Sequence, residues 1–562
     1  MSRDRRAVNR RIRLLLLALV LAFAGLLARA AWLQTVRASS LGRLATAQHR
    51  EPVTIPAGRG TLFDRTGVRL ALGVQATTIA ADPMQIRDPR RAATIAARTL
   101  GLDAKKLEVA LADRKRGFVY VARKADPKEA VALQRLGLAG FTFYPEEKRM
   151  YPQHAVAAQV LGYAGLDNKG LAGLEYELDK QLSGTPGREV IVKDPFGRPI
   201  DVEDDVTERP GRDVYLTLDH AIQANAEQVL RSTVAQYHAK DATAIVLDPR
   251  TGAVLAMAVE PGFDANRFGA APDGSQRNRA VTDMYEPGST FKLVTVAGAL
   301  SEGIVNPGTT FRLEPSIQVA DRVIHDAEER PTEYMSVAQI LARSSNVGAI
   351  TLAEMLGKHR LMKWIRRFGF GRLTGIDFPG EIRGAVLPED KWSGSTIGNV
   401  PIGQGIAVTP IQMASAYAAV ANRGVWVQPH LVDHVEGHGP RRPAHRRVVS
   451  RGVATELMAM LRDVVSGGTG TSAAVPGYRV AGKTGTAQKP DPQGGYSTNK
   501  YVASFVGVVP ASRPRLVILV AVDEPHGAIF GGMVAAPAFE QIARFDLQYL
   551  EVPPDATTSS AP

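Results

Sequence analysis

Three short motifs in the second half of the sequence carry side chains that could perform nucleophilic catalysis. They are Ser289-Thr290-Phe291-Lys292, Ser344-Ser345-Asn346 and Lys483-Thr484-Gly485. A serine hydroxyl is a weak nucleophile until a neighbouring base takes its proton. Residues at i and i+3 share one face of a helix, so the Lys292 amine can reach the Ser289 hydroxyl. The first motif therefore indicates a serine nucleophile for acyl transfer.

The S-x-x-K pattern is weak evidence by itself, because ordinary residue usage produces about one per chain of this length. Ser497 and Lys500 also match it, but they lead into a predicted strand, where this spacing keeps the amine away from the hydroxyl. Ser289 instead opens the apolar helix predicted over 292–301. A helix start supplies free N–H groups and a positive dipole end, which stabilise an oxyanion. We therefore place the nucleophile at Ser289; the alternatives are an ordinary helix cap and a solvated lysine.

The other two motifs have both a functional and a purely structural interpretation. In the functional one, Ser344 relays protons and Asn346 holds a substrate amide; in the structural one, the segment is local polar capping within a helix predicted over 337–356. Lys483 would supply positive charge and Thr484 would help to bind a carboxylate; the alternative is an exposed edge strand with a protective lysine. The occurrence of all three motifs in this order favours the functional interpretation.

Two further residues complete the strand motif. Thr486 would bind the same carboxylate as Thr484, and Gly485 would leave room for a substrate to lie along the strand.

The N-terminus predicts a membrane anchor. Residues 14–33 form an apolar stretch of about the length that crosses a bilayer, with Arg29 and Trp32 near its distal end, where both side chains suit the interface. The basic residues of the tail 1–13 should stay in the cytoplasm, which places the rest of the chain outside it. The alternative is a signal peptide cleaved after Ala28-Arg29-Ala30.

The remaining sequence predicts two domains and a tail. Residues 34–225 mix short strands and helices, including helices over 92–100, 107–111 and 128–136, and a helical continuation over 37–49. Residues 226–550 have strands at both ends (242–247, 253–258, 501–509 and 516–522) with helices between them. This order predicts an α/β (α+β) fold, a mainly antiparallel sheet covered by helices, with sheet neighbours far apart in the sequence. Residues 551–562 have a disordered composition.

Bulk composition excludes little. The net charge of +12 includes +5 from the N-terminal tail, and the remainder is diffuse apart from Arg441, Arg442, Arg446 and Arg447 in a predicted loop. No RNA- or DNA-binding signature accompanies these residues, so we expect no nucleic-acid partner. Cysteine is absent, which excludes disulfides and thiol catalysis.

The chain resembles the class B penicillin-binding proteins, monofunctional peptidoglycan D,D-transpeptidases. Beyond the three motifs, the resemblance rests on segments that start at Arg59 (RGTLFDRTG), Arg149 (RMYP), Gly173 (GLE), Val246 (VLDP), Asn278 (NRA) and Gly403 (GQG). It covers nearly the whole chain and implies an N-terminal pedestal or dimerisation-type domain before the transpeptidase domain. One departure is Gln153-His154 after Tyr-Pro, where the family often has a glycine.

The resemblance implies a mechanism without metal or cofactor. A neutral Lys292 takes the Ser289 proton, with its pKa lowered by burial and by Lys483. Ser289 attacks the penultimate D-Ala carbonyl of a stem peptide, and the backbone N–H groups of Ser289 and Thr486 form the oxyanion hole. An amine of a neighbouring stem peptide resolves the acyl-enzyme, and β-lactams acylate Ser289 as mimics of the donor.

Several alternatives remain. A β-lactamase would need a Glu-x-x-Leu-Asn segment, which 379–384 lacks, and a bifunctional enzyme would need a glycosyltransferase motif. A non-catalytic β-lactam sensor or divisome scaffold is the alternative of another class. Asn346 resembles division-type enzymes, whereas elongation-type relatives often carry Asp there. The resemblance thus implies a septal role, with a membrane glycosyltransferase and divisome proteins as partners.

Overall fold

The computed structural model describes residues 3–40, 50–193, 199–491 and 493–556. The chain divides into two compact units, one of residues 1–58 and 184–210 and the other of residues 59–183 and 211–562. The helical continuation predicted over 37–49 and the tail predicted over 551–562 both extend outside the described residues. The domain boundaries drawn from the sequence remain predictions.

The first unit contains a long apolar helix and a small sheet. Helix α1 (Arg3–Thr35) includes the predicted anchor, and its segment Ala7–Thr35 is long and apolar enough to cross a membrane, with a mean hydropathy of 2.4 over its most apolar window. No second such helix occurs among the described residues. The sheet is antiparallel in the order β1-β6-β7, formed by β1 (Arg50–Ile55), β6 (Gly187–Lys193) and β7 (Pro199–Val206).

The second unit begins with a sheet flanked by three helices. Its strands are ordered β18-β8-β2-β3-β4, with β5 paired to β3: β2 (Leu62–Phe63), β3 (Arg69–Ala81), β4 (Val119–Ala125), β5 (Phe141–Met150), β8 (Val214–Leu216) and β18 (Val432–Val435). The helices are α3 (Pro89–Leu100), α4 (Ala104–Ala112) and α5 (Pro127–Arg135), close to the predicted ranges. Each begins after an aspartate, Asp88, Asp103 or Asp126, whose carboxylate accepts hydrogen bonds from the first-turn N–H groups.

A buried ionic network joins segments of this unit that are far apart in the sequence. Arg59 Nε and Arg149 Nε each donate a 2.6 Å hydrogen bond to Glu175, one to each carboxylate oxygen, and all three side chains are almost fully buried. Arg59 also binds Asp179 at 2.7 Å, and Arg149 donates to the carbonyl of Gly60. Paired burial of these charges avoids the desolvation penalty of an isolated one. Three of the segments that resemble the family therefore meet in one structural joint.

The larger part of the second unit is built on a five-stranded antiparallel sheet, in the order β10-β9-β22-β21-β20. Its strands are β9 (Asp241–Leu247), β10 (Val254–Glu260), β20 (Ala481–Pro490), β21 (Tyr496–Val509) and β22 (Leu516–Asp523). β9 pairs with β22, although some 270 residues separate them. The predicted antiparallel sheet with neighbours distant in sequence is confirmed.

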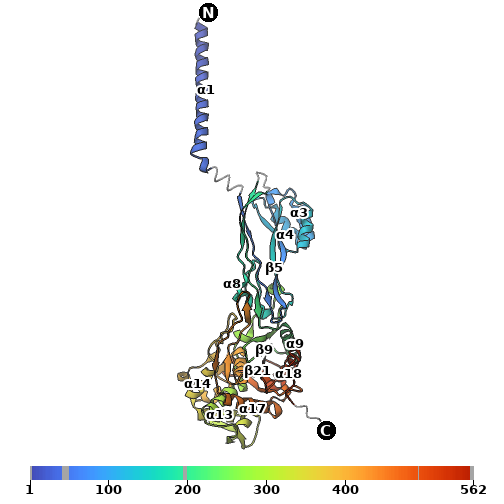
Figure 1. Ribbon diagram of the computed structural model, residues 1–562, viewed down its shortest axis with the longest axis vertical. Helices are drawn as coiled ribbons and strands as arrows, with labels where there is room; N and C mark the ends of the chain where they lie inside the picture. Colours follow the sequence, from blue (N-terminus) through green and yellow to red (C-terminus); the bar gives the residue numbers. More distant parts are fainter. Residues whose placement is uncertain (1–2, 41–49, 194–198, 492, 557–562) are drawn as a thin grey trace. The chain divides into compact units, whose positions relative to one another are not determined.

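Helices cover both faces of this sheet. Alternate β9 residues point to opposite faces: Ala244 and Val246 pack with helices α9 (His220–Tyr237) and α18 (Gly531–Tyr549), whereas Ile245 and Leu247 pack in the core of the other side. That other side holds α11 (Lys292–Ser301), α13 (Asn346–Leu356), α14 (Lys358–Phe368), α16 (Pro410–Ala421) and α17 (Arg451–Gly467). Figure 1 shows α9 and α18 together on one side of β9 and β21, and α13, α14 and α17 away from them.

One predicted helix is wrong. The range 337–356 is two helices, α12 (Val337–Ala342) and α13, separated by a turn in which Ser344 has a φ of +62°. The apolar pattern continues across the break, so periodicity alone does not reveal it.

The remaining elements are short. They are η1 (Pro83–Gln85), α6 (Ala158–Leu161), α7 (Gly173–Glu177), α8 (Asp179–Leu182), η2 (Ala265–Ala270), α10 (Arg279–Thr282), η3 (Gly288–Phe291), β11 (Thr310–Leu313), β12 (Ser316–Val319), β13 (Arg322–His325), β14 (Glu333–Ser336), β15 (Ala385–Val386), η4 (Glu389–Lys391), α15 (Thr396–Asn399), η5 (Val400–Ile402), β16 (Ile406–Ala407), β17 (Val425–Val427), β19 (His445–Arg447) and η6 (Thr471–Ala473).

Candidate active site

Ser289 lies in the tight 3-10 turn η3, which runs directly into helix α11. Gly288 begins the turn with a φ of +53°, a conformation that favours glycine. The buried Thr290 fixes the turn: its Oγ1 donates to the carbonyl of Pro287, and its own carbonyl accepts a 2.8 Å hydrogen bond from the hydroxyl of Tyr417 on α16. Ser289 itself is half-buried, and its Oγ makes no hydrogen bond to any described residue. The hydroxyl is thus held at a helix start and is free to react.

Lys292 joins the first motif to the second. Its side chain is completely buried, and its Nζ donates hydrogen bonds to Asn346 Oδ1 at 2.8 Å, to Ser344 Oγ at 3.2 Å and to the Ser344 carbonyl. Burial lowers the pKa of Lys292 to about 7, and the carboxylate of Asp326 opposes that shift. A substantial fraction of this amine is therefore neutral near pH 7, as a general base must be.

The second motif occupies the break between α12 and α13. Ser345 caps α13, because its Oγ accepts a hydrogen bond from the N–H of Gly348 at 3.0 Å. The positive φ of Ser344 directs the chain so that both its carbonyl and its hydroxyl reach the Lys292 amine. Ser345 therefore caps the helix, as the structural interpretation expects, while Ser344 and Asn346 contact the Lys292 amine.

Asp326 holds this break in place, and no motif or periodicity in the sequence identifies it. It follows strand β13 and accepts hydrogen bonds from Ser345 Oγ and from the N–H groups of Asn346 and Val347. Arg330 neutralises it through a 2.6 Å ion pair, and both side chains are about nine-tenths buried. Asp326 is thus a positioning residue for the second motif, supplied by a hairpin some 20 residues earlier.

The third motif lies on β20, the edge strand of the five-stranded sheet, but Lys483 is not an exposed protective lysine. It is fully buried, and its Nζ donates to Thr484 Oγ1 at 3.2 Å and to Thr469 Oγ1 at 3.5 Å. Burial, and next the positive charge of Lys292, hold its pKa well below the usual range. Lys292 therefore lowers the pKa of Lys483, whereas the pKa of Lys292 is lowered by burial and not by the charge of Lys483 that the resemblance implied.

Gly485 lets the nucleophile turn pack against β20. A Cβ atom at this position would lie 2.3 Å from Ser504 Oγ and 2.8 Å from the carbonyl oxygen of Pro287, so no larger residue fits. A Cβ atom on Gly288 would likewise lie 2.8 Å from the Thr486 carbonyl oxygen. The structure thus places the backbone of Thr486 beside the turn that carries Ser289. Atoms of Ser504 and Pro287 already occupy the position that a Cβ atom of residue 485 would take. That a substrate lies along the strand at Gly485 remains a prediction.

Thr486 and Thr484 are held from both sides. Thr486 Oγ1 accepts a 3.1 Å hydrogen bond from the N–H of Gly531 at the start of α18, and Thr484 Oγ1 lies 2.7 Å from Thr469 Oγ1. Thr469 was not predicted as a site residue. It follows α17 in a glycine-rich stretch, and this turn signal could have identified it as a candidate.

Ser497 and Lys500 do not form a catalytic pair. Ser497 lies in strand β21, where its Oγ donates to Asn499 Oδ1, while the Lys500 amine pairs with Glu524 at 3.5 Å. The strand separates the two side chains, as its spacing predicts.

Comparison with known proteins assigns both halves of the chain. Residues 242–544 match the family model of the penicillin-binding protein transpeptidase domain, and residues 54–216 match that of the penicillin-binding protein dimerisation domain. The chain belongs to the class B penicillin-binding proteins. It is 34% identical to the probable peptidoglycan D,D-transpeptidase PenA of Neisseria meningitidis over 98% of this chain and 95% of that one, and 33% identical to the peptidoglycan D,D-transpeptidase FtsI of Escherichia coli K12 over 98% and 94%.

Solved structures show the same fold. Apo penicillin-binding protein 3 of Mycobacterium tuberculosis is 33% identical, with a TM-score of 0.71 over 90% of this chain and 98% of that one. A structure of the mycobacterial protein complexed with ampicillin gives a TM-score of 0.72 with the same coverage and 32% identity.

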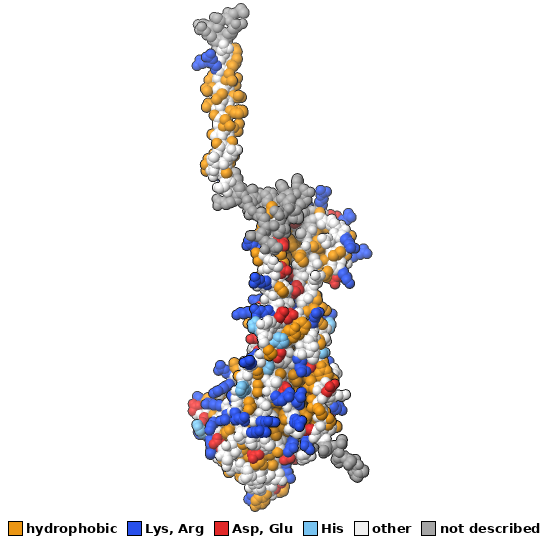
Figure 2. All heavy atoms as spheres, in the orientation of Figure 1, with side chains coloured by type: hydrophobic (Ala, Val, Ile, Leu, Met, Phe, Trp, Pro, Cys, Tyr) orange, Lys and Arg blue, Asp and Glu red, His pale blue; other side chains and the backbone are white. Residues whose placement is uncertain are grey.

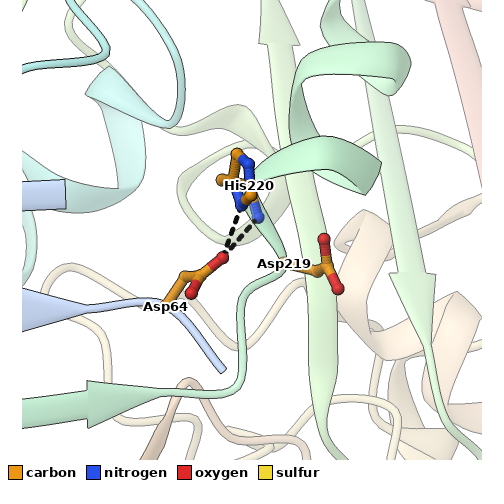
Figure 3. A group of neighbouring side chains, drawn as sticks. All are labelled: Asp64, Asp219 and His220. Carbon is orange, nitrogen blue, oxygen red and sulfur yellow. Dashed lines mark hydrogen bonds and ion pairs between the residues drawn. The ribbon is translucent and has the colours of Figure 1, made fainter. Parts of the chain in front are cut away.

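A second group of titratable residues in this penicillin-binding protein is structural. Asp64, Asp219 and His220 have ligand-type atoms within 4.8 Å of one another (Figure 3). Asp64 Oδ2 lies 2.7 Å from His220 Nδ1, and its carboxylate also accepts from the N–H groups of Thr66 and Val68. Asp219 caps α9 and pairs with Arg65. Because N–H donors engage both carboxylates, the group joins the segment that follows β2 to the start of α9.

Proposed function

We propose that this transpeptidase cross-links peptidoglycan stem peptides by two acyl transfers through Ser289. The observation that carries the proposal is the Lys292 amine, fully buried, with a pKa of about 7 and held between Ser344 and Asn346 in the turn of helix that follows Ser289. A neutral buried amine that follows a free hydroxyl by about one helical turn is suited to activate a serine near neutral pH.

The first transfer forms the acyl-enzyme. Lys292 takes the proton from Ser289 Oγ as the oxygen attacks the carbonyl of the penultimate D-Ala, and the backbone N–H groups of Ser289 and Thr486 stabilise the oxyanion. The tetrahedral intermediate collapses with loss of terminal D-Ala, whose amine receives a proton through Ser344. The terminal carboxylate would bind Thr484 and Thr486, next to the positive charge of Lys483 when that amine is protonated.

The second transfer resolves the acyl-enzyme. An amine of a neighbouring stem peptide attacks the ester carbonyl, loses its proton to the site, and releases Ser289 as the new amide forms. Asn346 would hold an amide of the donor peptide with its side chain, which already binds the His325 carbonyl through Nδ2 at 2.9 Å. β-Lactams acylate the same serine because they mimic the donor.

Fluorescent-penicillin labelling tests the nucleophile directly. The wild type and Ser497→Ala should be labelled, whereas Ser289→Ala should not. Label that survives in Ser289→Ala, or that disappears only in Ser497→Ala, would overturn the assignment. Turnover of a D-Ala-D-Ala thioester analogue with an added amine acceptor then separates an enzyme from a non-catalytic sensor or scaffold: a sensor would be labelled but would form no transfer product, and a hydrolase would form acid only.

We also propose an anchor at α1 with the catalytic domain outside the cytoplasm, because the basic residues lie before the apolar stretch. Proteolysis of intact spheroplasts should remove the catalytic domain. A septal role is supported by Asn346 at the third position of the middle motif, and a membrane glycosyltransferase and divisome proteins are the proposed partners. Depletion of the protein should give filaments; round cells would support the elongation alternative.

A further inference from the structure

Four arginines surround a small cavity in the transpeptidase domain, away from the three motifs. The cavity measures about 240 Å³, and the elements that line it are the end of α14, the loop after it, α16, and the paired strands β17 and β19. We call it the arginine pocket, and its charged lining residues are Arg366, Arg367, Arg372 and Arg446. Figure 2 shows Lys and Arg side chains gathered over the part of the domain that contains α14.

No acidic residue lines the arginine pocket. None of its four guanidinium groups makes an ion pair with any residue that the structure describes. Two of them are bound only to neutral groups: Arg367 Nε donates to the Val448 carbonyl at 2.6 Å, and Arg446 donates to the Arg367 carbonyl. The nearby carboxylate of Glu381 instead accepts from the backbone and hydroxyl of Thr374. Four positive charges therefore converge without compensation.

The helix end explains only part of this arrangement. Cations are favourable at the C-terminus of a helix, which accounts for Arg366 and Arg367 in the last turn of α14. Arg372 comes from the loop and Arg446 from β19, and both are brought to the same place against mutual repulsion. Arg446 is half-buried over the ring of Trp426 at 4.8 Å, and burial, together with Arg372 and Arg367, lowers its pKa. Arg446 therefore experiences the repulsion of its neighbours, and an anion bound in the pocket would relieve it.

A second, independent feature points into the same cavity. Ser415 on α16 lines the pocket, only 2% of its surface is exposed, and its Oγ has no hydrogen-bond partner. A buried hydroxyl without a partner costs free energy unless a ligand or water satisfies it. An anion held by the arginines could accept a hydrogen bond from this hydroxyl.

We propose that the arginine pocket binds a phosphoryl anion, such as a phosphate monoester or a diphosphate. Guanidinium groups recognise phosphate oxygens through paired charge-assisted hydrogen bonds. A phosphate monoester carries roughly two negative charges and three acceptor oxygens, which suits several converging guanidiniums better than the single charge and two oxygens of a carboxylate. This site is separate from the proposed acyl transfer and does not depend on it.

Titration of the full-length protein in neutral detergent with inorganic pyrophosphate, followed by calorimetry, tests the proposal. Arg366→Gln/Arg372→Gln removes two exposed guanidiniums and should weaken binding at least about tenfold, because a hydrogen bond to a charged group contributes roughly that factor. The matched control Arg451→Gln/Arg462→Gln removes two exposed arginines from α17 of the same domain and should bind like the wild type. Penicillin labelling of Ser289 should be equal in all three proteins, which shows that they are folded.

Three results would overturn the proposal: no pyrophosphate binding by the wild type, an equal loss in the control, or citrate binding as tight as pyrophosphate. Two further probes then distinguish a lipid headgroup from a soluble phosphate as the ligand. Tighter binding of monomeric dihexanoyl phosphatidic acid, a phosphate monoester, than of inorganic phosphate supports the site with a lipid headgroup as ligand, and the reverse order supports it with a soluble phosphate.

Discussion

The Lys292 amine donates a 2.8 Å hydrogen bond to Asn346 Oδ1, which couples the proposed general base to the middle motif. Asn346 is neutral, so it orients the amine without stabilising its protonated form through charge. Burial then dominates, and the pKa of Lys292 falls to about 7. A charged residue at position 346 would therefore act directly on the protonation of Lys292, the proposed base.

Acylation of Ser289 by penicillin should depend on pH with the profile of a lysine whose pKa is near 7. Only the neutral amine accepts the proton, so the second-order rate constant should rise about tenfold per pH unit below pH 7 and level off above it. Stopped-flow acylation between pH 5 and 9 measures this profile. A midpoint above pH 9 would show that Lys292 is not depressed or is not the base.

Asn346→Asp should shift this profile to higher pH. A carboxylate in place of the amide oxygen favours the charged lysine and raises its pKa, by about 1–3 units for an adjacent opposite charge. Acylation at pH 7 should therefore fall by about fivefold or more and recover in part at pH 9. An unchanged midpoint with a uniformly lower rate would mean that Asn346 acts only on the substrate.

The local parts of this site could be predicted from the sequence. The spacing of Ser289 and Lys292, the helix start at Ser289 and the edge strand of Lys483 are all encoded within about ten residues, and helix and strand periodicities identify them. The sequence predicts an antiparallel sheet whose neighbours are far apart in the chain, but it does not predict the order of the strands. The pairing of β9 with β22 depends on the whole chain.

The parts that the sequence could not predict depend on long-range contacts. The break at Ser344 is stabilised by Asp326, which lies in another element, while the apolar residues on both sides continue a helical pattern. The buried state of Lys483 depends on Thr469 and on the packing of η3 against β20. In the sequence, Arg59 and Glu175 belong to segments that resemble the family, but only the structure shows the ion pair between them.

Asp326→Asn should lower both stability and acylation. The variant removes the closer of the two carboxylates that pair with the buried Arg330 and weakens the hydrogen bonds to Ser345 Oγ and to the N–H groups of the α13 start. Breaking a buried pair of this kind costs about 3–5 kcal/mol. Thermal unfolding and the acylation rate of the folded protein at low temperature are the measurements. The control is Asp321→Asn, an exposed aspartate in the β12–β13 hairpin; equal effects in the two variants would refute a specific role for Asp326.

Glu175→Gln should destabilise the protein without changing the chemistry. Arg59 and Arg149 would lose the carboxylate that both bind at 2.6 Å, at a cost of about 3–5 kcal/mol for a buried network. Denaturant unfolding measures the loss, and Glu177→Gln, an exposed glutamate two residues later, is the matched control. The acylation rate of the folded fraction should equal that of the wild type; a slower rate would connect this joint to the catalytic site.

Asp546→Asn should stabilise the protein, and more so as the pH rises. Asp546 on α18 is fully buried, and neither carboxylate oxygen has a hydrogen-bond partner in the described chain. Burial, followed by the nearby charge of Asp219, holds its pKa well above the usual range. A carboxyl group whose pKa is raised on folding costs nothing below its unfolded pKa near 4 and destabilises the fold increasingly above it, until the folded group ionises.

Asparagine removes that cost because it never ionises. The melting temperature of Asp546→Asn should therefore match that of the wild type at pH 4 and exceed it at pH 8, while penicillin acylation stays the same. Asp463→Asn, an exposed aspartate on α17, should show no such difference between the two pH values. A variant that is less stable than the wild type at pH 8 would mean that the carboxylate of Asp546 is ionised and bound in the folded protein.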